Sequence, residues 1–271
     1  MKTLIIGTRG SALALAQATI VNDLLIAKHP DLCVETRIIK TIGDERLDID
    51  LTNPGDLGKG LFTKQLEDAL FSREIDLAVH SLKDLPVELP AGLVLGAIPE
   101  RADFADVLVS KHAGGIAGLP AGATVATSSH RRECLLEYLR PGLRTSAIRG
   151  NVPTRLKKLA EDPALDALVL AKAGLDRLGH QIVPDGLLVT VETGMLPAPG
   201  QGALGLECRE GDEETLHVLE AIHHEDTARC VHAERALLLA LGGGCASPVA
   251  AHATLINNKV VLRSMIFGEA S

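Results

Sequence analysis

Three turns in this chain place arginine and small residues between an apolar strand pattern and a helix pattern. They are Thr8-Arg9-Gly10-Ser11, Ser128-Ser129-His130-Arg131-Arg132 and Arg149-Gly150-Asn151. A helix start offers unpaired N–H groups and the positive end of the macrodipole, and arginine adds a planar fork that matches carboxylate or phosphate. Solvated arginines at a helix start explain any one turn as well. Three turns of one design predict a site for a small, strongly anionic ligand.

A lysine and an aspartate are adjacent where another apolar run ends, in His80-Ser81-Leu82-Lys83-Asp84. Lys83 supplies a cation for binding. A carboxylate among several cations stays ionised, so Asp84 is suited to stabilise positive charge on a substrate or to move a proton from a cationic nitrogen. A surface lysine beside a helix-capping aspartate explains the pair equally well. His80 is interpreted as a buried, hydrogen-bonded strand residue.

Two glycine loops carry further reactive or mobile positions. Gly58-Lys59-Gly60-Leu61-Phe62 lacks the spacing and the Lys-Ser/Thr ending of a P-loop, so we interpret it as a lid that contributes Lys59 and Phe62. In Gly242-Gly243-Gly244-Cys245 the glycines allow close approach of a ligand, and an accessible thiolate can bond to an electrophile. A cysteine that merely packs within the loop remains the alternative.

The remaining cysteines and four of the histidines are interpreted as structural residues without a chemical role. The other four cysteines lie in strand or helix patterns, where a small buried hydrophobe is the default. The histidine spacing matches no standard zinc pattern, so we predict no metal site and expect helix-surface positions for His217, His223, His224 and His232.

These residues must be positioned by alternating strands and helices. Short apolar runs and helical patterns alternate over most of the chain, which predicts βαβ units around parallel sheets, with ligands at the carboxyl ends of the strands. Breaks near residues 98–101 and 193–197 divide the chain. We expect two doubly wound α/β domains joined by hinges, residues 1–98 with about 195–218 and residues 102–192. We expect residues 219–271 to form a small α+β domain with a helix at roughly 228–241 and strands at 249–256 and 259–266.

Composition excludes several classes of protein. The chain has 271 residues, a formal net charge of -8, 4 Phe, 1 Tyr and no Trp. Few aromatics argue against single-stranded nucleic acid and the acidic balance against duplex binding. No apolar run suits a membrane span or a signal peptide. Five unpaired cysteines favour a reducing compartment, so a cytoplasmic protein is expected.

Taken together and in order, these segments resemble the porphobilinogen deaminase (hydroxymethylbilane synthase) family over nearly the whole chain. Besides the motifs above, the matching segments are Gly43-Asp44, Thr154-Arg155-Leu156, Ala173-Gly174-Leu175 and Pro199-Gly200-Gln201-Gly202-Ala203.

The resemblance implies a monomeric transferase of haem-type tetrapyrrole biosynthesis. It would condense four porphobilinogen molecules head to tail, release ammonia each time, and free hydroxymethylbilane by hydrolysis. It implies two periplasmic-binding-protein-like domains and a dipyrromethane cofactor, made of two substrate units and held by a thioether at Cys245. Relative to the family, the third domain looks shortened.

The resemblance also assigns residues to roles. Asp84 is the expected catalytic group. The expected cofactor ligands are Cys245, Lys83, Asp84, Ser129, Arg131 and Arg132, the expected substrate ligands are Arg9, Ser11, Arg149, Arg155 and Arg177, and the expected active-site loop carries Lys59 and Phe62.

Two other functions are considered beside this one. A non-catalytic two-domain receptor for a small anion has the same architecture, although the lack of a signal sequence argues against an exported form. A thiol enzyme would use Cys245 as nucleophile with a histidine base, but no histidine has a position that recommends it.

Overall fold

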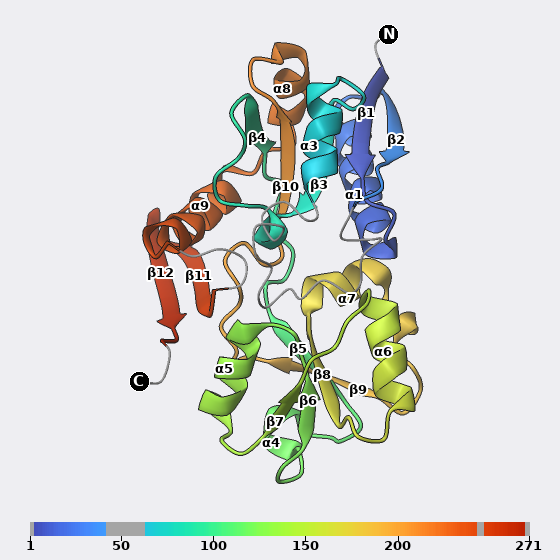
Figure 1. Ribbon diagram of the computed structural model, residues 1–271. Coiled ribbons are helices and arrows are strands. Elements are labelled where there is room, and N and C mark those ends of the chain that lie inside the picture. Colours follow the sequence, from blue (N-terminus) through green and yellow to red (C-terminus); the bar gives the residue numbers. More distant parts are fainter. Residues whose placement is uncertain (1–2, 42–62, 243–246, 269–271) are drawn as a thin grey trace.

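The computed structural model describes residues 3–41, 63–242 and 247–268. Two α/β domains, each built on a five-stranded sheet, lie one above the other, and a smaller domain with a two-stranded sheet lies beside them (Figure 1). Lys59, Phe62, Cys245 and the Gly43-Asp44 motif lie outside the described residues. Within the described ranges, no helix combines the length and apolarity needed to cross a bilayer.

The first sheet has the strand order β2-β1-β3-β10-β4. Its strands are β1 (Thr3–Thr8), β2 (Cys33–Ile38), β3 (Leu77–Ser81), β4 (Leu93–Ala97) and β10 (Leu204–Arg209). The helices α1 (Ala12–Lys28), α3 (Lys64–Phe71) and α8 (Glu213–Glu220) pack against it. A single 3-10 turn, η2 (Leu82–Asp84), follows β3 directly and carries Lys83 and Asp84.

The second sheet has the order β7-β6-β8-β5-β9. Its strands are β5 (Asp106–Ser110), β6 (Thr124–Ala126), β7 (Arg144–Ser146), β8 (Ala167–Ala171) and β9 (Leu188–Glu192). The helical segments of this domain are α4 (Gly115–Gly118), α5 (His130–Leu139), α6 (Val152–Glu161), α7 (Lys172–Leu178) and η3 (His180–Ile182). Aliphatic side chains fill both faces of the sheet, so the low aromatic content does not leave the core unfilled.

The expected pair of α/β domains is confirmed, but the prediction of parallel sheets is wrong for two strands. β10 runs antiparallel to β3 and β4, and β5 runs antiparallel to β8 and β9. Each is the strand by which the chain enters a sheet from the other domain. Such a strand closes no βαβ crossover, so it is not constrained to run parallel to its neighbours.

The small C-terminal domain consists of α9 (Glu225–Ala240) and the hairpin β11 (Val249–Ile256) and β12 (Lys259–Ile266). Both strands have the expected bounds. Asn257 and Asn258 adopt positive φ values of 50° and 62°, as a tight hairpin turn requires. α9 begins earlier than expected because His224 caps it, with Nδ1 3.2 Å from the Thr227 amide nitrogen.

Two segments cross between the α/β domains, residues 98–105 and 193–203, and they lie side by side. The Ala102 amide donates to the Gly202 carbonyl at 3.2 Å. Gly202 has φ +88°, and an added Cβ would lie 2.6 Å from the Ala102 oxygen, so this crossing requires glycine. Phe104 stacks on His252 of β11 at 3.6 Å between ring centroids. The small domain therefore packs directly on the crossing.

Candidate active site

Ser128 joins the residues that follow β6 to those that follow β7 by hydrogen bonds. Ser128 Oγ donates to the Ile148 carbonyl at 2.7 Å and accepts from the Ile148 amide at 2.9 Å. The Thr127 amide donates to the Ser146 carbonyl at 2.8 Å. These contacts hold together the two basic turns of the second domain, as expected for the carboxyl ends of adjacent parallel strands.

The Arg149-Gly150-Asn151 turn has its own internal supports. Gly150 has φ +112°, a conformation that favours glycine. Asn151 caps α6 by accepting from the Thr154 amide at 2.9 Å. Arg155 donates from Nε to the Gly150 carbonyl at 2.7 Å, so this arginine is anchored to the turn.

Arg131 and Arg132 are buried and share a carboxylate that the sequence analysis did not identify. Arg131 Nη2 donates to Asp106 Oδ2 at 2.8 Å, and Arg132 Nη2 donates to Asp106 Oδ1 at 2.7 Å. Burial by itself raises the pKa of Asp106, but the charges of Arg132 and Arg131 outweigh it and hold this pKa well below its usual range. Asp106 is therefore ionised and keeps two guanidinium groups in a fixed orientation.

Gln201 joins this cluster to Lys83 across the domains. Its Nε2 donates to Asp106 Oδ1 at 2.8 Å, and its Oε1 accepts from Lys83 Nζ at 3.5 Å. Burial lowers the pKa of Lys83 to about 8, a shift that the Asp84 charge opposes and the Arg132 charge reinforces. Lys83 from the first domain and Arg132 from the second thus lie in one electrostatic environment.

Arg155 belongs to the same environment. Burial lowers its pKa, the nearby charge of Arg132 lowers it further, and the charge of Asp84 raises it. Asp84 itself is exposed at the end of η2. The structure therefore brings Lys83 and Asp84 together with Arg131, Arg132 and Arg155, and Arg149 also acts on Arg155.

Other predicted ligands have different surroundings. Ser11 caps α1 by accepting from the Ala14 amide at 3.2 Å, with Arg9 in the preceding turn, and α1 approaches α7 where Leu13 lies beside Gly174. Ser129 is the N-cap residue of α5. Arg177 donates to the Gly202 carbonyl at 2.7 Å, and burial lowers its pKa to about 10. Arg177 thus lies against the interdomain crossing.

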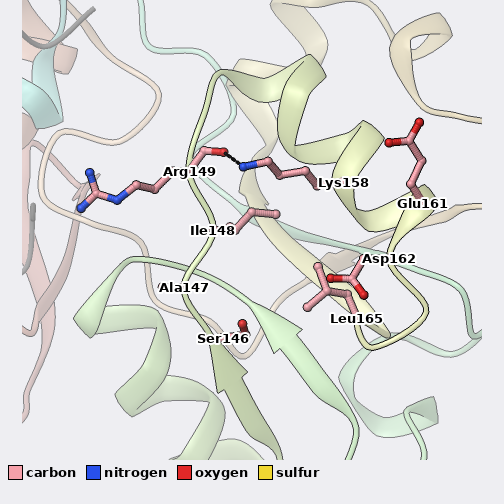
Figure 2. A pocket seen from close by; sticks show the side chains of 8 residues that line it. All are labelled: Ser146, Ala147, Ile148, Arg149, Lys158, Glu161, Asp162 and Leu165. Carbon is pink, nitrogen blue, oxygen red and sulfur yellow. Dashed lines mark hydrogen bonds between the residues drawn. The ribbon is translucent and has the colours of Figure 1, made fainter. Parts of the chain in front are cut away.

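A hollow of about 670 Å³ opens beside the turn that carries Arg149 (Figure 2). Lys158 Nζ donates to the Arg149 carbonyl at 3.1 Å. Figure 2 shows the Arg149 side chain extending away from Lys158, with Glu161 and Asp162 at the other end of the hollow. Because carboxylates line it as well as cations, this hollow is less suited to a polyanion than the cluster around Lys83.

The structural interpretations of histidine and cysteine are confirmed in part. His80 is buried, and its Nε2 lies 2.9 Å from Glu207 Oε2. His217 and His232 are exposed on helices, while His223 and His224 bond to the backbone of the protein. Cys208 and Cys230 are buried, but the expectation was wrong for the other two: Cys134 is partly exposed, and Cys33 is exposed on β2, an edge strand of its sheet.

Comparison with known proteins decides the family. The family model described as "Porphobilinogen deaminase, dipyromethane cofactor binding domain" matches residues 4–217, and the model of the porphobilinogen deaminase C-terminal domain matches residues 228–269. The chain belongs to the porphobilinogen deaminase family. Curated relatives of that name include those of Syntrophobacter fumaroxidans (48% identical over 261 residues, 96% of this chain, 83% of the relative) and Geobacter sulfurreducens (48% over 262 residues, 96% and 80%). The Desulforudis audaxviator relative is 48% identical over 266 residues, 98% of this chain and 84% of the relative.

Porphobilinogen deaminases are transferases that polymerise porphobilinogen to hydroxymethylbilane, and their cofactor is dipyrromethane. The described residues fit such a group. The side-chain Nε atoms of Arg131 and Arg132 are buried and have no hydrogen-bond partner among the described residues, and cations outnumber carboxylates around Lys83. This donor set suits a ligand with several carboxylates.

Four residues that make buried ion pairs or hydrogen bonds around the candidate site were missed by the sequence analysis: Asp106, Arg101, Glu234 and Arg235. Glu234 and Arg235 interrupt an otherwise apolar stretch of a helix pattern, Ala-Glu-Arg-Ala-Leu-Leu, and two adjacent charges in such a stretch were the available signal. Asp106 begins an ordinary apolar strand and gives no comparable signal. Gln201 lies in a motif that the sequence analysis quoted, but without a role.

Proposed function

We propose that this chain condenses four porphobilinogen molecules head to tail, with loss of ammonia, and that the cluster around Lys83, Asp84, Arg132 and Arg155 is the site. The observation that carries the proposal is the meeting of cations from both domains beside one exposed carboxylate. Each pyrrole of the substrate carries two carboxylates, so the growing product needs several fixed cations in a partly buried site.

In this proposal Asp84 is the catalytic residue. Each condensation breaks the bond between the aminomethyl carbon and its nitrogen, which leaves as ammonia, and forms a carbon–carbon bond to the next ring, which then loses a proton. The Asp84 carboxylate stabilises positive charge on pyrrole nitrogen during these steps. Lys83 and the arginines bind and orient the carboxylate arms, because a bidentate guanidinium fixes both position and direction.

The cofactor would supply the terminal pyrrole to which the first substrate is joined. We assign its thioether to Cys245 and its carboxylates to Lys83, Ser129, Arg131 and Arg132. Substrate arms are assigned to Arg9, Ser11, Arg149, Arg155 and Arg177, and the active-site loop to Lys59 and Phe62. The terminal nitrogens of Arg131 and Arg132 donate to Asp106 and to the carbonyls of Leu196 and Val169. Their Nε atoms have no partner among the described residues, and these atoms support the cofactor assignment.

Intact-mass spectrometry tests the assignment. The purified chain is expected to exceed its sequence mass by two linked pyrrole units, and Cys245→Ser is expected to show the sequence mass alone. Cys33→Ser, which changes an exposed cysteine on β2, is the matched control and should retain the excess. An unmodified wild-type chain, expressed in a host that makes porphobilinogen, would contradict the proposal and favour an anion receptor.

We further propose that the chain acts as a cytoplasmic monomer in which residues 1–98 with about 195–218, residues 102–192 and residues 219–271 move as three domains. The net charge of -8 supports the absence of a nucleic-acid partner. The two crossings, which lie side by side, support a hinge that opens as the product lengthens. Light scattering coupled to gel filtration tests the first point: a mass near 57 kDa (~ twice 28.5 kDa) would contradict it.

A further inference from the structure

One arginine of the C-terminal domain is bonded to the turn that carries Lys83 and Asp84. Arg235 lies on α9 and is 7% exposed. Its Nη1 donates to the carbonyls of Leu82 and Leu85 at 3.4 and 3.0 Å. Its Nη2 donates to the carbonyls of Pro86 and Val87 at 2.7 and 3.2 Å. One guanidinium thus holds four carbonyls from a stretch of six residues.

The turn has few supports of its own. η2 is a single 3-10 turn, whose hydrogen-bond geometry is intrinsically poor, and the Leu85 amide reaches the Leu82 carbonyl at 3.3 Å. The Leu82 amide donates to the Ala203 carbonyl at 3.0 Å, which fixes the beginning of the turn. Arg235 supplies the bonds that fix its end.

Apolar contacts orient the same turn. Leu82 and Leu85 are buried against Ala228 and Val231 of α9, whereas the intervening Asp84 is exposed. The side of the turn that faces α9 is therefore anchored by two leucines and one guanidinium. The position of the Asp84 carboxylate depends on how firmly that anchored side is held.

We propose that Arg235 is a positioning residue for the reaction: from the C-terminal domain it fixes the backbone that aims Lys83 and Asp84 at the substrate. This inference rests on the function proposed above for Asp84. Small displacements of a catalytic group reduce the rate steeply, by as much as about a hundredfold for 1 Å. Losing the hydrogen bonds of Arg235 to this turn is therefore expected to lower kcat far more than it raises KM.

The test compares variants of the cofactor-loaded full chain. Arg235→Met keeps the apolar part of the side chain and removes the donors. Arg235→Lys keeps the charge but lacks the two terminal nitrogens of the planar guanidinium. Arg229→Met is the matched control, because Arg229 also lies on α9 and donates to one partner, Asn258, at 2.6 and 2.9 Å. It removes two hydrogen bonds to the turn between β11 and β12 and leaves the bonds of Arg235 to the catalytic turn in place.

For each variant we would measure the intact mass, kcat, KM and the amide exchange of a peptide covering residues 82–89. In Arg235→Met we expect kcat to fall about tenfold to a hundredfold, KM to change less than about threefold, and exchange in residues 82–89 to accelerate. Arg235→Lys should be intermediate in both kcat and exchange, and Arg229→Met should match the wild type.

Wild-type kcat and wild-type exchange in a folded, loaded Arg235→Met variant would overturn the proposal. If Arg235→Met does not fold, Arg235→Lys decides: wild-type kcat and protection in that variant would show that the guanidinium fork is not needed. A fall in kcat without faster exchange in residues 82–89 would also contradict positioning through the turn. Failure of the function itself is distinguishable, because the wild type would then carry no mass excess and make no product.

Discussion

Arg101 and Glu234 form a buried, bidentate ion pair that joins the interdomain segment 98–105 to α9. Arg101 Nη1 donates to Glu234 Oε1 at 2.7 Å, and Nη2 donates to Oε2 at 3.1 Å. Glu234 is fully buried and also accepts from the amides of Gly200 and Ala253 at 2.7 and 2.8 Å. This one carboxylate therefore joins both crossings to the C-terminal domain.

Glu234→Gln should destabilise the protein strongly. It leaves the Arg101 guanidinium buried without its counter-charge, which costs about 3–5 kcal/mol. The free energy of unfolding, or of the first transition if several appear, would be measured in urea by circular dichroism. Glu161→Gln is the control, because its pair with Lys157 is 3.7 Å long and exposed, so about 0.5 kcal/mol or less is expected. Equal effects of the two changes would contradict the role of Glu234.

Asp84→Asn should separate cofactor loading from turnover. The amide keeps the shape of the side chain but cannot stabilise positive charge, so kcat should fall by roughly 10²–10⁴ while the mass excess remains. Glu88→Gln, an exposed carboxylate a few residues further along, should leave kcat nearly unchanged. Product formation and intact mass are the measurements. Near-normal turnover by Asp84→Asn would remove this residue from the mechanism.

Anion binding by the cofactor-free protein should weaken as pH rises through about 8, the pKa to which burial lowers Lys83. Below that pH Lys83 is charged and attracts carboxylates; above it the charge is lost. With Cys245→Ser protein and pyromellitate as a tetracarboxylate probe, calorimetry should show binding roughly several-fold weaker at pH 9 than at pH 7. Adding Lys83→Gln should abolish that difference. A pH dependence that survives Lys83→Gln would place the titrating group elsewhere.

Asp106→Asn should destabilise the second domain, because two buried guanidiniums lose their shared carboxylate, at a cost of about 3–5 kcal/mol at neutral pH. The folded-state pKa of Asp106 is below its ordinary value of 3.8. Its stabilisation is therefore complete above that value and is lost as the pH falls below it. The difference in free energy of unfolding between wild type and variant, measured in urea, should accordingly fall by about 1 kcal/mol from pH 4 to pH 3. A gap that is constant with pH would mean that the carboxylate charge is not what stabilises the pair.

Much of the local structure could be predicted from the sequence, because its causes lie within a few residues. The hairpin of β11 and β12 follows from alternation around Asn257-Asn258, and its bounds were correct. The cap at Asn151 and the burial of His80 follow from residue type and local pattern in the same way. Lys83, Arg131 and Arg132 were identified because an anion site requires cations at such turns, whereas Arg155 was assigned through the family resemblance.

The sequence by itself determined the alternation of elements, the family, and the type of side chains that gather at the site. Tertiary structure alone decided which groups those side chains contact. Arg131 contacts the Asp106 carboxylate, Lys83 donates to Gln201, and Arg235 donates to the carbonyls of the catalytic turn. These contacts join residues 25, 118 and 150 positions apart. Helix and strand periodicity constrain only residues that are close in the sequence, whereas these contacts depend on how the domains pack. The antiparallel pairing of β10 with β3 is part of that packing, and no local pattern specifies it.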